Sequence, residues 1–281
     1  MNNYPKVSFL ITAYNHELYV YDTIVSACSQ NYCGEMEILI SDDASTDNTW
    51  KMIQKALVDN TSKYDVHAFR NEYNMGIGGN VANLFSRATG DIIVFSDGDD
   101  ISYSHRVDVL VKKHMQFPHI LLLDSNYDFL CGTNIFSHFV EAQEFSINDF
   151  ITGTICLSGC TRSIKRIVID KYPPISTFCP TGDSITILRA LLLGNGQKVA
   201  AMIDDTLVKY RIHENQVSNS INIKKINRKS IVKQYISDIK YALKHKFISK
   251  RYILGLILFI IKYGLAAALQ NNKIWQKIRK R

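Results

Sequence analysis

The sequence lacks most of the short motifs that identify a metal-binding or nucleotide-binding protein. Its six cysteines form no CxxC pair and show no spacing with histidine that suits zinc, so a zinc site is not expected. A GxxxxGK[ST] segment is also missing, which argues against a P-loop ATPase. Gly76-Ile77-Gly78-Gly79 lacks the third glycine of a GxGxxG fingerprint and does not directly follow a strong strand.

The sequence also shows no signal peptide and no internal repeat. Residues 1–4 are polar, the apolar run at 7–12 is too short for a signal peptide, and no repeat or low-complexity segment is evident. With 281 residues, 46% hydrophobic and 21% charged, the chain is expected to be globular, with one large or two modest domains. We expect a cytoplasmic protein whose cysteines are reduced and mostly buried.

Acidic residues almost disappear from the C-terminal part of the chain. Residues 224–281 contain 16 Lys or Arg and one acidic residue, Asp238, whereas the rest carries 17 basic and 25 acidic residues. The net charge of +7 therefore conceals an acidic body and a basic tail. This asymmetry predicts an anionic partner for the tail, either a membrane or a nucleic acid.

The first half of the chain alternates strand and helix patterns, which favours an α/β fold with a mostly parallel central sheet and helices on both faces. The pattern predicts strands at 7–12, 37–41, 66–70 and 91–96, and helices at 17–30, 46–57, 79–88 and 104–117. Residues 120–180 are less periodic and indicate short strands and loops. A helix at 181–193 and two short strands at 198–203 and 206–211 are expected to follow.

Three carboxylates, Asp97, Asp99 and Asp100, directly follow the apolar strand predicted at 91–96. Crowding three like charges costs free energy unless a cation lies between them. Oxygen ligands alone indicate a hard divalent ion, Mg²⁺ or Mn²⁺, which usually keeps positions open for substrate phosphates. The alternative is a solvated acidic turn, because Asp and Gly are ordinary turn residues.

Two more predicted strands end in polar residues, the first at Thr12-Ala13-Tyr14-Asn15 and the second at Ser41-Asp42-Asp43. In a doubly wound sheet such ends lie side by side on one edge. A carboxylate there can accept hydrogen bonds from a base or a ribose, and an aromatic ring such as Tyr14 can stack on a base. The pattern predicts a nucleotide-diphosphate site, although Tyr14 could instead pack in the core and Asp42 could simply end its strand in a turn.

In their order and spacing, these segments resemble family 2 glycosyltransferases, which have the GT-A nucleotide-diphospho-sugar transferase fold. The resemblance covers about residues 5–220 and is carried by Pro5–Glu17, Glu37–Asp47, Asn74–Gly76, Thr89–Asp100, Thr181–Asp183 and Tyr210–His213. A QxxRW segment, the mark of processive polysaccharide synthases in this family, is absent. With no region of several membrane spans either, the resemblance implies that one sugar is added per encounter.

The resemblance also implies which residues bind the sugar donor. The nucleoside would be held by Thr12, Tyr14 and Asp43, with Asp97 nearer the ribose and the sugar. Asp99 would be the principal ligand of Mn²⁺ or Mg²⁺, and the metal or diphosphate would also be contacted by Asp97 and His213. On sequence alone, a surface position is an equal alternative for His213.

Asp183 would be the general base of an inverting displacement, by the same resemblance. Gly182 precedes it where other members have Glu, as in a subgroup of bacterial surface-polysaccharide transferases. The reaction would move a sugar from a nucleotide-diphosphate donor, with uridine suggested by Asp43 and Tyr14, to a hydroxyl of a glycan or lipid-linked glycan acceptor. The alternative is that Asp183 merely caps its helix.

We expect three regions along the chain. Residues 1–117 would form the nucleotide-sugar-binding half and residues 118–220 the acceptor-binding half of one catalytic domain, and residues 221–281 a basic, amphipathic, helical tail. The apolar run at 253–269 is slightly short for a membrane span and contains Lys262. It therefore predicts an interfacial helix on an anionic membrane, preceded by a basic amphipathic helix at 226–243.

That tail predicts a peripheral enzyme on the inner face of the cytoplasmic membrane. A core-packing or dimerising helix is the alternative for the tail. Nucleic acid is not expected as a partner, because the acidic body offers no basic groove with interleaved aromatics.

Two other functions compete with glycosyl transfer. A sugar nucleotidyltransferase should carry a glycine-rich, lysine-containing loop after the first strand, where this chain has Ala13-Tyr14-Asn15-His16. A membrane-attached protein that binds a nucleotide sugar without turnover would share the same motifs. Receiver-like proteins also place paired aspartates at strand ends, but they are shorter and lack the later segments.

Overall fold

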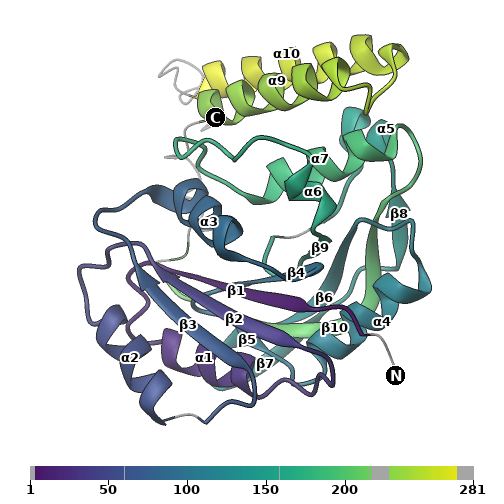
Figure 1. The fold of residues 1–281 in the computed structure, drawn as a ribbon. Helices are drawn as coiled ribbons and strands as arrows, with labels where there is room; N and C mark the ends of the chain where they lie inside the picture. The colour runs from purple at the N-terminus through teal and green to yellow at the C-terminus, as the bar shows by residue number, and fades with distance from the viewer. Residues whose placement is uncertain (1–3, 60, 158, 215, 217–227, 271–281) are drawn as a thin grey trace.

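The computed structural model describes residues 4–59, 61–157, 159–214, 216 and 228–270. Its centre is a sheet with strand order β3-β2-β1-β4-β9-β6-β10-β5, to which β7 and β8 add at the side (Figure 1). The strands are β1 Val7–Ala13, β2 Met36–Asp42, β3 Asp65–Arg70, β4 Ile92–Asp97, β5 Ile101–Ser102, β6 Leu122–Cys131, β7 Asn134–His138, β8 Gln143–Phe145, β9 Ser163–Lys165 and β10 Ala200–Arg211.

Helices cover both faces of this sheet. They are α1 Val20–Cys28, α2 Thr49–Asp59, α3 Gly76–Arg87, α4 Arg106–Gln116, α5 Ile147–Thr152, α6 Ile167–Asp170, α7 Asp183–Gly194, α9 Arg228–Lys244 and α10 Ile253–Gln270, with a short 3₁₀ helix at Lys250–Tyr252. Figure 1 shows α1 and α2 below the sheet and α3, α6 and α7 above it. The expected α/β architecture, a central sheet with helices on both faces, is confirmed, and the sheet combines parallel and antiparallel pairs.

The sheet is parallel across β3, β2, β1 and β4, and β9 then pairs antiparallel with both β4 and β6. All seven residues of β2 are buried, as expected for a strand covered on both faces. Alternate residues of β1 serve the two cores. Phe9 and Ile11 belong to the core between the sheet and helices α1, α2 and α4, whereas Leu10 belongs to the core that includes residues of α3 and α7.

Two expected strands at 198–203 and 206–211 are in fact the single strand β10. Its register with β6 shifts between Ile203 and Thr206 and again before Val208. Asp204 and Asp205 interrupt the apolar pattern and suggested a turn, but the chain accommodates them as a local irregularity of one strand.

β6 spans ten residues inside the region that was expected to hold only short strands and loops. Asp124, Ser125 and Asn126 interrupt its apolar pattern, yet all three are buried. Asn126 is satisfied by accepting a hydrogen bond from the backbone of Val140 and donating to its carbonyl.

The helix α2 also begins three residues later than expected. The carboxylate of Asp47 accepts hydrogen bonds from the backbone N–H and the hydroxyl of Thr49, so the side chain of Asp47 caps the start of this helix.

The helices α9 and α10 lie side by side on α7 and α5, at the top of Figure 1. One face of α9 belongs to the main core through Ile231, Tyr235, Ile239 and Ala242. Among the helices of the described residues, none combines the length and the apolar character needed to cross a bilayer. Most of the polar segment at 213–220 and the basic residues at 224–225 and 271–281 lie outside the described residues.

Candidate active site

The carboxyl ends of β1, β2 and β4 meet at one edge of the sheet, as the strand-end pattern predicted. Thr12 lies opposite Ser41 on one side and Asp97 on the other. The loop after β4 approaches β1 so closely that a Cβ atom on Gly98 would lie 2.8 Å from the carbonyl oxygen of Thr12 and 2.7 Å from Nδ1 of His16. Glycine at 98 therefore allows the carboxylates to turn back over the end of β1.

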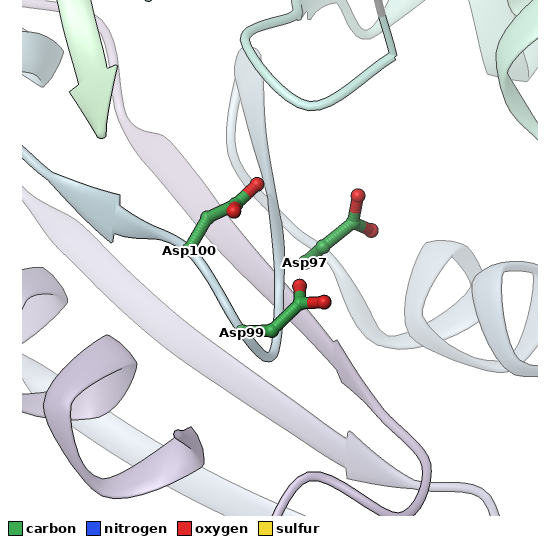
Figure 2. A group of neighbouring side chains, drawn as sticks. All are labelled: Asp97, Asp99 and Asp100. Carbon is green, nitrogen blue, oxygen red and sulfur yellow. The ribbon is translucent and has the colours of Figure 1, made fainter. Parts of the chain in front are cut away.

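Asp97, Asp99 and Asp100 gather around this turn (Figure 2), each offering a carboxylate oxygen within 4.8 Å of the others. The pKa of Asp97 is raised to about 7, mainly because the surrounding protein removes water from its carboxylate and then because Asp99 and Asp183 are negatively charged. Water reaches part of the Asp97 side chain, and this favours a smaller shift in the same direction. Burial, with repulsion from Asp99 and Asp97, raises the pKa of Asp100 well above its usual value.

Asp99 is held differently, because two histidines face it. Burial alone would raise its pKa, but a hydrogen bond from His213 and the charges of His16 and His213 outweigh burial and lower it. Nε2 of His213 lies 2.8 Å from Oδ2 of Asp99, and Nε2 of His16 lies 3.8 Å from the same oxygen. The His213 side chain is 9% exposed and packs against the ring of Tyr19 in a tilted arrangement, so His213 is not a surface residue.

Arg211 holds the two last aspartates of the cluster, Asp99 and Asp100, by hydrogen bonds. Its backbone N–H donates to Oδ1 of Asp100 at 2.9 Å, and its Nε donates to the carbonyl of Asp99 at 2.9 Å. Oδ2 of Asp100 is buried and has no hydrogen-bond partner among the described residues. An unpaired carboxylate oxygen beside two more carboxylates is the environment that a divalent cation would stabilise.

Two consecutive aspartates at the end of β2 differ in role: Asp42 is structural, and Asp43 is a candidate for binding. Asp42 is fully buried and pairs with Arg70 and Ser45, consistent with the strand-end role considered for it. Oδ1 of Asp43 accepts hydrogen bonds from Asn71 and from the backbone of Met75, which orients the carboxylate. Tyr14 is 42% exposed, so it is not a core aromatic and its ring is accessible for stacking.

Asp183 is the first residue of α7, one position after the N-cap residue Gly182, so it is not the residue that caps the helix. Its Oδ1 instead accepts a hydrogen bond from Nη2 of Arg162 at 2.6 Å, and 53% of its side chain is exposed. A negative charge that is partly open to solvent and close enough to affect Asp97 can act as a base at this edge of the sheet.

The structure thus brings Thr12, Asp97, Asp99, Asp183 and His213 into one region. Asp43 and Tyr14 lie at the neighbouring strand ends. Sequence reasoning assigned no role to three side chains of this region: His16, Arg162 and Arg211. His16 and Arg211 stand inside recognised segments, whereas Arg162 carries no local signal because its partner is 21 residues away.

Comparisons with known proteins agree with this geometry. Residues 8–172 match the family model described as Glycosyl transferase family 2. EpsE of Bacillus subtilis (strain 168) is 32% identical over 120 residues, which cover only 42% of this chain and 42% of EpsE. The Escherichia coli enzyme WfaP, a UDP-Glc:alpha-D-GlcNAc-diphosphoundecaprenol beta-1,3-glucosyltransferase, is 28% identical over 92% of this chain and 96% of its own.

Solved structures show the same fold. TarS residues 1–349 from S. aureus, in complex with UDP-GlcNAc, superpose with a TM-score of 0.62 at 19% identity, covering 86% of this chain and 70% of TarS 1–349. The GT-A fold expected from the sequence is confirmed by this likeness. Because the family model matches more than half of its residues, the chain belongs to glycosyl transferase family 2 and is a glycosyltransferase.

Proposed function

We propose that this enzyme is an inverting, metal-dependent, non-processive glycosyltransferase that moves a sugar from a UDP-sugar to a lipid-linked glycan in surface polysaccharide synthesis. The observation that carries the proposal is the Asp97–Asp99–Asp100 cluster beside an exposed carboxylate, Asp183. These groups supply the two requirements of the reaction, a site for a metal and diphosphate and a base for the attacking hydroxyl.

The substrates are inferred from relatives. WfaP and WfgD of Escherichia coli both carry a name that states UDP-Glc as donor, GlcNAc-diphosphoundecaprenol as acceptor and a beta-1,3 product. The glucosyl–phosphate bond of UDP-glucose is α, so a β product corresponds to inversion. A third relative from Campylobacter jejuni is also named for a glucosyl transfer to a PP-undecaprenol-linked glycan. These names support a lipid-linked acceptor and a UDP-sugar for this chain.

The residues present fit a divalent metal. Asp99 would be its principal ligand, with Asp97 and His213 beside it, and the unpaired oxygen of Asp100 adds negative charge behind them. Hard oxygen ligands suit Mn²⁺ or Mg²⁺. When bound, such an ion would offset the charge that develops on the departing diphosphate.

In the proposed mechanism, the protein first orients the sugar donor. Asp43 accepts hydrogen bonds from the nucleoside, Tyr14 stacks on the base, and Thr12 and Asp97 lie under the ribose and sugar. Asp183 then takes the proton of the acceptor hydroxyl as that oxygen bonds to the anomeric carbon. The anomeric carbon–oxygen bond to the diphosphate breaks at the same time, and its electron pair leaves with the nucleoside diphosphate.

Donor binding tests the assignment of the cluster. We expect UDP-sugars to raise the melting temperature of the wild-type protein only when Mn²⁺ or Mg²⁺ is present, because they bind the native state. Asp99→Asn should lose this shift, whereas Asp59→Asn, at an exposed position on α2, should retain it. An equal, metal-independent shift in Asp99→Asn would refute the metal-dependent site.

We also propose that α9 and α10 bind an anionic membrane surface, which would place the enzyme beside a lipid-linked acceptor. The outer face of α10 is apolar over three turns and is formed by exposed side chains of Leu254, Ile257, Leu258, Ile261 and Leu265. The outer face of α9 is basic and carries exposed Lys229, Lys233, Lys240 and Lys244.

The positions on both helices recur at intervals of three, four and seven residues, so each set forms one stripe. Both stripes lie opposite the buried faces of their helices. An apolar stripe beside a lysine stripe suits the boundary between anionic headgroups and acyl chains. This arrangement supports a peripheral location on the inner face of the cytoplasmic membrane.

Vesicle sedimentation tests this surface. Ile257→Ser with Ile261→Ser, and separately Lys233→Glu with Lys240→Glu, should each lower binding to phosphatidylglycerol vesicles at least tenfold. Lys51→Glu with Lys55→Glu, on the exposed face of α2, should bind like the wild type. If the α9 and α2 charge variants lose binding equally, the attraction is a general charge effect and the proposed surface is wrong.

A further inference from the structure

A buried arginine holds the carboxylate of the proposed base. Arg162 precedes β9, and 2% of its side chain is exposed. Its Nη2 donates to Oδ1 of Asp183, whereas its Nε and Nη1 are buried without a hydrogen-bond partner in the described part of the chain. Asp183 is thus the principal partner for this buried guanidinium charge, and hydrogen bonds between two charged groups are among the stronger ones in proteins.

The position of Arg162 is itself fixed by the strand that bears the carboxylate cluster. The carbonyl oxygen of Arg162 accepts a hydrogen bond from the backbone N–H of Phe95 at 3.0 Å. Its guanidinium lies over the ring of Phe95, 4.6 Å from the ring centroid, where a desolvated cation–π contact is favourable. Phe95 stands two residues before Asp97, so Arg162 connects the Asp97 strand to Asp183.

Gly159 contacts the Asp183 carboxylate at its other oxygen. A Cβ atom at residue 159 would lie 2.1 Å from Oδ2 and 2.6 Å from Cγ of Asp183. The carboxylate therefore occupies the space that any other side chain at this position would fill. Oδ1 is held by Arg162, and Oδ2 rests against the backbone of Gly159.

We propose that Arg162 is a positioning residue for the glycosyl transfer, and that Arg162 and Gly159 together hold the Asp183 carboxylate where it can take the proton of the acceptor hydroxyl. With Oδ1 engaged by the guanidinium, Oδ2 is the oxygen that accepts the hydroxyl proton. This inference rests on the proposed role of Asp183 as the base. A purely structural ion pair would support folding without affecting the orientation of the base.

Steady-state transfer kinetics separate the two roles. Arg162→Ala should lower kcat about 100-fold, since a displacement of about 1 Å of a catalytic group can cost that much. The KM for the sugar donor should change less than about twofold, because that KM depends on Asp43 and Asp99. Millimolar guanidinium should restore at least a tenth of the lost rate to Arg162→Ala, and Arg162→Lys should be intermediate. Arg166→Ala, four residues away and paired with Asp170, should behave like the wild type.

Gly159→Ala provides a test that does not depend on removing a buried charge. The added methyl group meets the end of the Asp183 side chain, which can move aside, so the melting temperature should stay within a few degrees while kcat falls at least tenfold. Wild-type kcat in both Arg162→Ala and Gly159→Ala would overturn the proposal. So would a fall in Arg162→Ala that matches its loss of folded protein and shows no guanidinium rescue.

Asp183→Asn distinguishes this failure from that of the base itself. If Asp183→Asn is inactive but Arg162→Ala and Gly159→Ala both retain full kcat, the positioning role is wrong and the base assignment stands. If Asp183→Asn is fully active, the base assignment is wrong and the positioning role is overturned with it.

Discussion

Asp97 and Asp99 stand two residues apart but carry opposite pKa shifts. Burial and the neighbouring carboxylates raise the pKa of Asp97, whereas His16 and His213 lower that of Asp99. Asp99 is therefore ionised throughout the neutral range, whereas Asp97 is the harder of the two carboxyls to ionise. A divalent cation between them would favour the ionised form of both carboxylates.

At the residue scale, Gly98→Ala tests the geometry of this turn. The new methyl group would lie 2.8 Å from the backbone oxygen of Thr12, so the turn must move and carry Asp97 and Asp99 with it. We expect metal-dependent donor binding to weaken at least tenfold in a thermal-shift titration. Gly264→Ala, where a Cβ atom meets nothing within 4 Å, is the matched control. Unchanged donor affinity in Gly98→Ala would contradict the close approach.

Sequence reasoning identified the acidic residues of this site because each follows a strand or opens a helix within a short motif. It assigned no role to His16 or Arg162, since their importance comes from partners far along the chain. Asp99 is 83 residues from His16, and the pairing of Arg162 with Asp183 depends on how α7 packs beside β9. No local pattern encodes such contacts.

At the element scale, an ion pair joins α7, the helix that carries the proposed base, to the tail helix α9. Arg189 and Asp238 form two hydrogen bonds of 2.8 and 3.0 Å, and their side chains are 1% and 2% exposed. Gln234 on α9 donates to Asp238 and accepts a hydrogen bond from the backbone of Ser176. The one acidic residue of the basic tail is thus a buried structural group.

Breaking this pair should destabilise the whole domain. Asp238→Ala leaves Arg189 buried without its partner, and we expect it to lower the free energy of unfolding by about 3–5 kcal/mol in a denaturant titration. The double variant Arg189→Met with Asp238→Leu should be more stable than Asp238→Ala, because it removes both charges. A loss below about 1 kcal/mol in Asp238→Ala would show that α9 does not depend on the pair.

The contact between α4 and β9 predicts a pH effect on stability. His114 is buried, and its Nε2 lies 3.0 Å from the hydroxyl of Ser163. Burial lowers the pKa of His114 to about 3 from its usual 6.5. The unfolded chain therefore binds a proton that the native state excludes, and the contribution of His114 to stability is lost as pH falls from about 6.5 towards 3.

His114→Gln should remove this dependence. Between pH 7 and pH 5, the wild type should lose about 2 kcal/mol more stability than His114→Gln, from 1.36 kcal/mol per unit of pKa difference. Chemical unfolding of both proteins at the two pH values measures this difference. Parallel losses in the two proteins would show that His114 does not titrate on unfolding.

The same scale shows where local patterns fail to predict elements. The strands β1, β2 and β4 were predictable because they are continuous apolar runs, as buried parallel strands require. The polar residues of β6 and the Asp204-Asp205 pair of β10 interrupt that pattern. Their strand conformation depends on partners such as Val140 that lie outside the strand, so tertiary contacts override the local pattern.

At the scale of the whole molecule, the acidic body and the basic helical pair should orient the enzyme on a bilayer. The apolar stripe of α10 and the lysine stripe of α9 are exposed, and α7, which carries the proposed base, contacts α9 and lies between α9 and the sheet (Figure 1). Binding to anionic vesicles should weaken as salt rises from about 0.05 to 0.5 M, because exposed charges are screened. Salt-independent binding would show that the lysine stripe contributes nothing.

The most direct measurement is transfer of labelled sugar from a UDP-sugar panel that includes UDP-glucose to GlcNAc-diphosphoundecaprenol, with Mn²⁺ present. We predict that the wild-type protein forms a β-linked product and releases UDP only when acceptor is present, and that Asp183→Asn lowers the rate about 10²–10⁴-fold while still binding the sugar donor. Transfer by Asp183→Asn at the wild-type rate, or an α-linked product from UDP-glucose, would contradict the proposed inverting mechanism.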